Sequence, residues 1–165
     1  MNSPTLVGSL VFAAVLVVLI AVVIQLMMIG WRRRALRQEE LIGHLPDIPD
    51  EVGTATTTLR GVYVGSTLAP ESNERVTAGD LGYRSKAVLS RYPEGILLER
   101  IRANPIWIPQ SAISEVRTER FAAGKIAARN GILAIRWRLP SGVEIDTGFR
   151  AGNRDEYDGW LGEAA

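Results

Sequence analysis

The chain has 165 residues, a formal net charge of +1 and no cysteine. Without cysteine it has no disulfide, no thiolate nucleophile and few of the ligands that structural zinc prefers. The single histidine, His44, lies in a polar segment beside prolines, where we expect it to be solvated, so a Ser-His-Asp site lacks its base. We therefore expect no catalytic residue, no cofactor and no metal site.

The first predicted element is an uncharged stretch at residues 6–29, preceded by a tail of five uncharged residues. At about 1.5 Å per residue, its 24 residues make a helix of roughly 36 Å, enough to cross a hydrocarbon core of about 30 Å. The residues that set its orientation follow directly: Trp31, Arg32, Arg33, Arg34 and Arg37. By the positive-inside rule, we expect a single span of the inner membrane with the N-terminus outside and the C-terminal part in the cytoplasm.

A cleaved secretory signal peptide is the alternative interpretation of this stretch. Signal peptides carry a basic segment before an apolar core of about 7–15 residues. Here the apolar core is longer, and the basic residues follow it instead of preceding it. The pattern favours a permanent anchor. Small and amide side chains at positions 9, 13, 21 and 25 leave open whether the helix self-associates.

The charge of the remaining chain differs from that of the whole. Without the four arginines that follow the span, fifteen basic side chains face eighteen acidic ones, all of which come after residue 38. This balance, about −3, lacks the basic surface by which proteins neutralise nucleic-acid phosphates. We therefore exclude nucleic acid as a partner.

A basic juxtamembrane segment and linker at residues 30–53 precede one domain at residues 54–163. Gly43, Pro46 and Pro49 end the helical pattern, and β-branched residues with turn signals every 8–12 residues then indicate a small antiparallel barrel or sandwich. The predicted strands are 54–64, 75–78, 84–92, 95–101, 106–108, 113–117, 132–139 and 143–149. Turns at 93–95 and 140–142 combine Pro with a Gly that we expect to supply a positive φ.

The last two strands predict their own register. Leu139 opposite Val143 places Arg138 opposite Glu144 and Arg136 opposite Asp146, two charge pairs worth roughly 0.2–1 kcal/mol each. We interpret these four charged residues as a solvated sheet face. After them, Asn153 is a good helix N-cap, and Tyr157, Trp160 and Leu161 form one apolar stripe that we expect to cover the open end of the barrel.

This plan of about seven antiparallel strands and a C-terminal helix resembles the pleckstrin-homology (PH) superfold, and several fragments resemble the bacterial PH-like domains. They are Gly95-Ile-Leu-Leu-Glu-Arg, Ile106-Trp-Ile-Pro, Tyr63-Val-Gly-Ser-Thr and Asp146-Thr-Gly-Phe-Arg. Taken together they are similar to an actinobacterial family of single-pass membrane proteins of uncharacterised activity. Lipid-binding PH domains cluster bases between their first two strands, but residues 65–74 here hold two glutamates and no base.

Two short motifs suggest chemistry, but neither is complete. Asp146-Thr147-Gly148 spells the aspartic protease triplet without the second aspartate and following chain that this enzyme needs, so a hydrolase requires an unpaired Asp146 in a polar pocket. Gly124-Lys125 resembles the end of a P-loop, but Ile126 stands where Ser or Thr belongs. Neither motif predicts an enzyme.

A basic loop is the remaining candidate site. It surrounds small residues between 117 and 131 and holds Arg117, Arg120, Lys125 and Arg129. These residues are a solvated loop by default or, alternatively, a contact for an acidic partner or anionic lipid headgroups. We expect a membrane-tethered, non-enzymatic module that recruits or organises a cytoplasmic protein partner; the alternative is a lipid- or ligand-sensing module that uses this loop.

Overall fold

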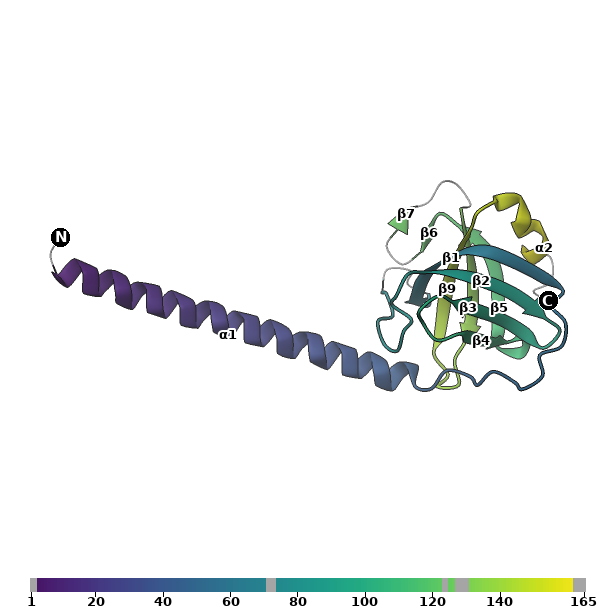
Figure 1. Ribbon diagram of the computed structural model, residues 1–165. Helices are drawn as coiled ribbons and strands as arrows, with labels where there is room; N and C mark the ends of the chain where they lie inside the picture. The colour runs from purple at the N-terminus through teal and green to yellow at the C-terminus, as the bar shows by residue number, and fades with distance from the viewer. Residues whose placement is uncertain (1–2, 71–73, 123–124, 127–130, 162–165) are drawn as a thin grey trace. The chain divides into compact units, whose positions relative to one another are not determined.

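The computed structural model describes residues 3–70, 74–122, 125–126 and 131–161 and divides the chain into two units. One unit comprises residues 1–37 and the other residues 38–165. The first is the greater part of a single helix, α1 (Ser3–Ile42). The second holds the strands and the C-terminal helical segment (Figure 1).

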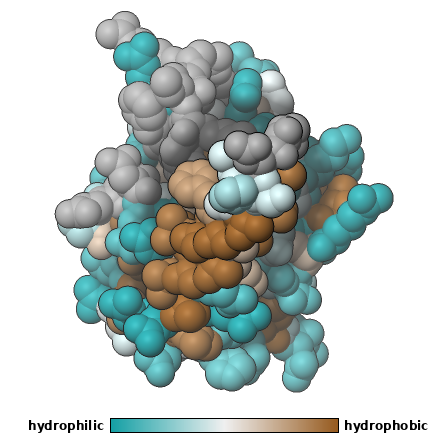
Figure 2. Space-filling model, turned by 90° about the vertical axis from the view of Figure 1, so that its left-hand side faces the viewer, coloured by the Kyte–Doolittle hydropathy of each residue, from teal (hydrophilic) through white to brown (hydrophobic). Residues whose placement is uncertain are grey.

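Helix α1 carries no charged residue along the stretch predicted to span a membrane. It has 40 residues, and its apolar part is long and hydrophobic enough to cross a bilayer. The large apolar side chains of residues 6–29 are exposed. Figure 2 shows a gathering of hydrophobic side chains near the centre of the view. The helix continues through the arginines, as the sequence allowed, and ends before Gly43. That glycine adopts φ 61° and donates its N–H to the Glu39 carbonyl at 3.0 Å, a left-handed C-terminal cap.

Seven antiparallel strands form one sheet in the order β4-β3-β2-β1-β9-β8-β5. Their bounds are β1 (Thr57–Leu68), β2 (Ser85–Tyr92), β3 (Gly95–Arg100), β4 (Ile106–Pro109), β5 (Ile113–Glu119), β8 (Ile132–Arg138) and β9 (Glu144–Ala151). A short pair, β6 (Phe121–Ala122) and β7 (Lys125–Ile126), lies between β5 and β8 in the chain, and a 3-10 turn, η1 (Gln110–Ala112), joins β4 to β5. The predicted fold class, an apolar helix followed by a mainly-β domain with a short C-terminal helix, is confirmed.

The predicted strand at residues 75–78 is wrong. Within the described residues this segment forms only an isolated bridge between Thr67 and Arg75. The Arg75 guanidinium donates instead to the carbonyls of Gly82 at 2.6 Å and Val64 at 3.3 Å, so the side chain holds a turn in place of a ladder. Burial of Val76 explains the apolar pattern that suggested a strand.

The last hairpin has the predicted register. Arg138 opposes Glu144 and Arg136 opposes Asp146, and the turn glycine Gly142 has φ 90°. Gly95 in the other predicted turn serves a different purpose, because it does not adopt a positive φ. A Cβ there would lie 2.4 Å from the Ile108 carbonyl and 2.8 Å from the Trp107 ring, so close packing requires the glycine.

The core of the second unit contains a buried chain of polar side chains. The Trp137 indole donates to Thr147 Oγ1 at 2.9 Å, Thr147 Oγ1 lies 3.0 Å from Ser66 Oγ, and Ser66 Oγ lies 2.9 Å from the Tyr63 hydroxyl. That hydroxyl donates to the Leu81 carbonyl at 2.7 Å. Burial raises the pKa of Tyr63 to about 12 and keeps it neutral. Each link satisfies a group that would otherwise be buried without a partner.

The last turn of α1 belongs to the second unit. Gln38 is 6% exposed, and its amide oxygen accepts from the Thr77 backbone N–H at 3.1 Å and from Thr77 Oγ1 at 2.8 Å. Its amide nitrogen donates to the Arg75 carbonyl at 3.3 Å, and Ile42 packs in the core. The domain therefore begins structurally inside the helix.

The C-terminal segment is helical, as predicted, but consists of a 3-10 turn, η2 (Arg154–Tyr157), followed by a short helix, α2 (Asp158–Leu161). Asn153 caps it by accepting the Asp155 N–H at 3.2 Å. Tyr157 and Trp160 are buried in the core, whereas Leu161 is 39% exposed. The predicted stripe therefore buries two of its three residues, because the first turn is 3-10 and shifts the spacing.

Candidate functional site

The arginines that were predicted to set membrane topology are exposed on α1. They are Arg32, Arg33, Arg34 and Arg37, and Trp31 beside them is exposed as well. Because successive helical residues are rotated by about 100°, the first three arginines point to different sides of the helix. None of the ion pairs found among the described residues uses them. Their exposure is compatible with the predicted role in membrane topology, which stays a prediction.

The basic loop is described only in part. Arg120 is exposed, Lys125 lies in β7, and Arg129 is outside the described residues. Arg117 lies in β5 and is ion-paired with Asp146 at 2.8 Å, with Glu115 at 3.2 Å and with Glu119. Its charge is therefore engaged within the sheet, and the suggested contact with an acidic partner or lipid stays a prediction that depends on the other three bases.

The aspartate of the protease-like triplet is held by two arginines. Arg136 donates from Nε to Asp146 Oδ1 and from a terminal nitrogen to Oδ2, both at 2.9 Å, and Arg117 donates to the same two oxygens. Asp146 is only 6% exposed. The predicted pairing with Arg136 is confirmed, but the expectation of a solvated sheet face is wrong for Asp146.

Small side chains explain how Arg117 reaches this carboxylate. Ala134 lies opposite Arg117 on one side and opposite Gly148 on the other, so one row across β5, β8 and β9 carries a single bulky side chain. The Arg117 side chain has room to extend over the two small residues toward Asp146. The pairing of Arg117 with Asp146 could not be predicted from the sequence, because it depends on the register between β5 and β8 as well as on the register of the β8–β9 hairpin.

Electrostatics keeps Asp146 ionised. Burial alone would raise its pKa, but hydrogen bonds from Arg136 and Arg117 outweigh burial and hold the pKa below the ordinary value. The same contacts raise the pKa of both arginines. A carboxylate fixed as an anion between two cations cannot serve as one of a pair that shares a proton, so the hydrolase interpretation loses its required unpaired Asp146.

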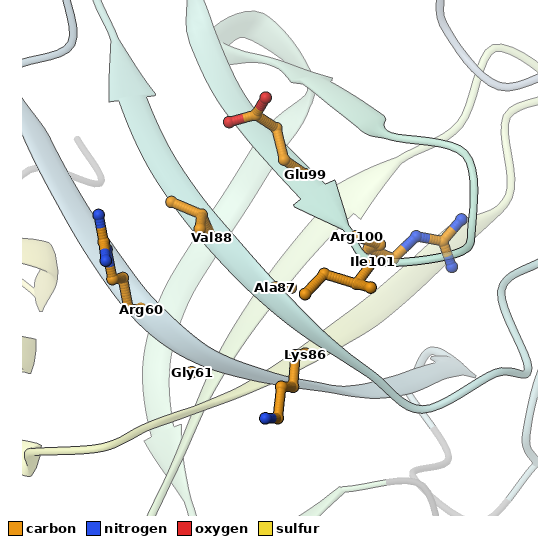
Figure 3. A pocket seen from close by; sticks show the side chains of 8 residues that line it. All are labelled: Arg60, Gly61, Lys86, Ala87, Val88, Glu99, Arg100 and Ile101. Carbon is orange, nitrogen blue, oxygen red and sulfur yellow. The ribbon is translucent and has the colours of Figure 1, made fainter.

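A groove of about 470 Å³ lies on the outer face of β1, β2 and β3. The lining residues include Arg60, Lys86, Val88, Glu99 and Ile101 (Figure 3). In Figure 3 the Arg100 side chain turns away from the others, in agreement with its hydrogen bonds to the carbonyls of Asp80 at 2.6 Å and Asn104 at 2.6 Å. The volume of the groove falls in the range of about 300–1,000 Å³ that is typical of ligand sites.

Sequence analysis did not identify this groove. Ile101 is 59% exposed, an unusual position for an isoleucine, and Arg60, Lys86 and Glu99 are exposed around it. Alternation along the strands is the signal that could have placed these four residues on outward positions, since each lies next to a buried residue in the chain. Their convergence depends on strand order, which alternation within single strands does not reveal.

No metal centre is evident in the part of the chain that the structure describes, where no three His, Asp or Glu side chains gather. His44 is exposed in the linker, as expected. The P-loop-like glycine, Gly124, lies outside the described residues, and the lysine after it is in β7.

Comparison with known proteins identifies the second unit. A family model described as bacterial PH domain-like matches residues 42–165, which is most of the chain. The match begins at the last residue of α1, where the chain enters the domain core. No curated protein matches the chain.

Proposed function

The chain belongs to the bacterial PH domain-like family, and from this membership we propose that it is a membrane-tethered, non-enzymatic interaction module. PH-like domains are generally binding modules without catalytic activity. The observation that carries the proposal is that an apolar helix of spanning length leads directly into such a domain. The pairing of Asp146 with two arginines supports the non-enzymatic part.

The helix is proposed to cross the inner membrane once, with the domain in the cytoplasm. Four exposed arginines and Trp31 directly after the apolar stretch support this orientation. The docking of Gln38 and Ile42 on the domain supports a permanent helix rather than a cleaved signal sequence, because cleavage after the apolar stretch would leave a basic, structured remnant. The resemblance to single-pass actinobacterial proteins agrees with the same arrangement.

The partner is proposed to be a cytoplasmic protein that the domain recruits or organises at the membrane. The chain after Arg37 carries eighteen acidic and fifteen basic side chains, and residues 65–74, where lipid-binding PH domains place their bases, carry Glu71 and Glu74. Its anchor makes a second attachment to lipid unnecessary for localisation. A protein surface is therefore the better candidate ligand.

A lipid-sensing module that uses residues 117–129 is the second candidate, and exposed Arg120 favours it. Amide hydrogen exchange of the full chain in nanodiscs tests it. Adding phosphatidylglycerol to phosphatidylcholine should then slow exchange at residues 117–122. Unchanged exchange with anionic lipid present would rule out this candidate.

Crosslinking in intact cells tests the leading proposal. We expect specific cytoplasmic proteins to be crosslinked to the chain and to be identified by mass spectrometry. Exchanging residues 6–29 for an unrelated span should leave these partners unchanged, because the domain selects them. Loss of every partner on that exchange would instead assign the interaction to the membrane helix and contradict the proposal.

A further inference from the structure

The outer face of β9, β1, β2 and β3 carries two rows of side chains whose alignment follows from the strand register. Arg60 opposes Val88, and Val88 opposes Glu99. In the next row Arg150 opposes Val62, Val62 opposes Lys86, and the Ile101 N–H donates to the Lys86 carbonyl at 2.9 Å. In the second row cations and aliphatic side chains therefore alternate from β9 to the residue that follows β3, whereas the first row ends in a carboxylate.

The three cations of this face are exposed and available. Arg60, Lys86 and Arg150 take part in none of the ion pairs among the described residues, whereas Arg117, Arg136 and Arg138 are paired with carboxylates. Glu99 is the one carboxylate that lines the groove, at its β3 side. The face is thus basic, with three cations to one carboxylate.

The apolar part of the face is equally specific. Val62 is half-buried between two cations, Val88 is half-buried between Arg60 and Glu99, and Ile101 is 59% exposed at the end of its row. An aliphatic side chain placed over them would remove apolar surface from water at about 25 cal/mol per Å². Strands lie about 4.8 Å apart, so the row from Arg150 to Ile101 measures roughly 14 Å, the length of four or five extended residues.

We propose that this face, Arg60, Val62, Lys86, Val88, Ile101 and Arg150, binds an acidic segment of a partner protein that carries an aliphatic residue between its carboxylates. Carboxylates would contact the three cations, and the aliphatic residue would lie over Val88 and Ile101. The negative charge of Glu99 disfavours a purely phosphate ligand at the β3 side. It favours a peptide, because its carboxylate can accept hydrogen bonds from peptide N–H groups. The inference rests on the proposed role of the domain as a protein-binding module.

Peptide binding by the full chain in phosphatidylcholine nanodiscs tests this assignment. The probe is a fluorescent peptide with two glutamates on each side of a leucine, and its anisotropy is followed as the chain is added. Replacing its glutamates by glutamine, or its leucine by serine, should weaken binding roughly tenfold or more. Equal binding of all three peptides would overturn the proposal.

Variants of the chain locate the site. Arg60→Gln with Lys86→Gln should weaken binding of the acidic peptide at least about tenfold, because two charge contacts are lost. Arg138→Gln is the matched control, since Arg138 is 63% exposed but lies on β8 beside Glu144, and it should bind like the unmodified chain. Undiminished binding to the double variant, with its circular dichroism unchanged, would overturn the assignment.

Two further outcomes separate this inference from the proposed function. A dye on a Thr58→Cys variant, at an exposed position in β1 two residues from Arg60, should respond to the acidic peptide; if it responds only when phosphatidylglycerol is added, the occupant is lipid and the inference fails. Crosslinked partners that persist in the Arg60→Gln, Lys86→Gln variant in cells would likewise refute the groove assignment while leaving the interaction module intact.

Discussion

At the scale of single residues, the structure distinguishes charges that hold the fold from charges that are free to bind. Asp146, Arg117 and Arg136 form a partly buried cluster, whereas Arg60 and Lys86 face solvent beside a groove. Breaking a buried charge pair leaves an uncompensated charge, but removing an exposed one costs little. The two groups therefore predict opposite results on substitution.

Asp146→Asn should destabilise the domain by roughly 1–3 kcal/mol, because two arginines lose their charged acceptor. Glu144→Gln is the control, since Glu144 pairs with an exposed Arg138 at 3.4 Å and its loss should cost at most about 1 kcal/mol. Urea unfolding of the full chain in detergent, followed by tryptophan fluorescence, measures both. Equal effects of the two substitutions would contradict the structural role of the cluster.

Acid should weaken the domain through the same carboxylate. The pKa of Asp146 is lower in the folded state than in the unfolded chain, where an aspartate titrates at about 4. The stability it contributes is complete above that value and is lost as the pH falls through the folded pKa. Urea midpoints measured from pH 7 to pH 3 should therefore fall less steeply for Asp146→Asn than for the unmodified chain; parallel profiles would contradict this assignment.

At the scale of elements, sequence patterns predicted the strands that pair with their neighbours in the chain. The hairpin of β8 and β9 could be derived because alternation and a Pro-Ser-Gly turn act over short distances. The structure of residues 75–78 could not be derived in this way. The same apolar alternation arises when Val76 is buried by a turn that Arg75 and Gln38 hold in place. The groove also depends on contacts between strands that are distant in sequence.

The end of α1 offers a test of how the helix joins the domain. Gln38→Ala removes three hydrogen bonds to residues 75–77 and should cost roughly 1–3 kcal/mol of domain stability. Glu40→Ala, at an exposed position two residues later, should change stability little.

A double-mutant cycle sharpens this test. Thr77→Val removes the hydroxyl that donates to Gln38 at 2.8 Å, so the losses from Gln38→Ala and Thr77→Val should not add. Urea unfolding of the four proteins in detergent measures the coupling. Fully additive losses would show that Gln38 does not hold this turn.

At the scale of the whole molecule, an apolar helix of spanning length leads into a PH-like domain. The fold class followed from the sequence because apolar length and strand spacing are visible in it. The proposed binding face could not be predicted from the sequence, because exposed cations are common and only the pairing of strands in the sheet brings Arg60, Lys86 and Arg150 together. If the helix spans a membrane, as we propose, tethering keeps the domain at the bilayer, so that a weak contact with a partner suffices there.

Cysteine labelling measures the central claim, a permanent span with a cytoplasmic domain, most directly because the chain has no cysteine of its own. Single Ser3→Cys and Glu94→Cys variants, both at exposed positions, are treated in spheroplasts with a membrane-impermeant maleimide. We predict that Ser3→Cys is labelled at once and Glu94→Cys only after permeabilisation, each on a chain of full mass. Labelling of Glu94→Cys in sealed spheroplasts, or a mature chain that lacks residues 1–29, would contradict the account.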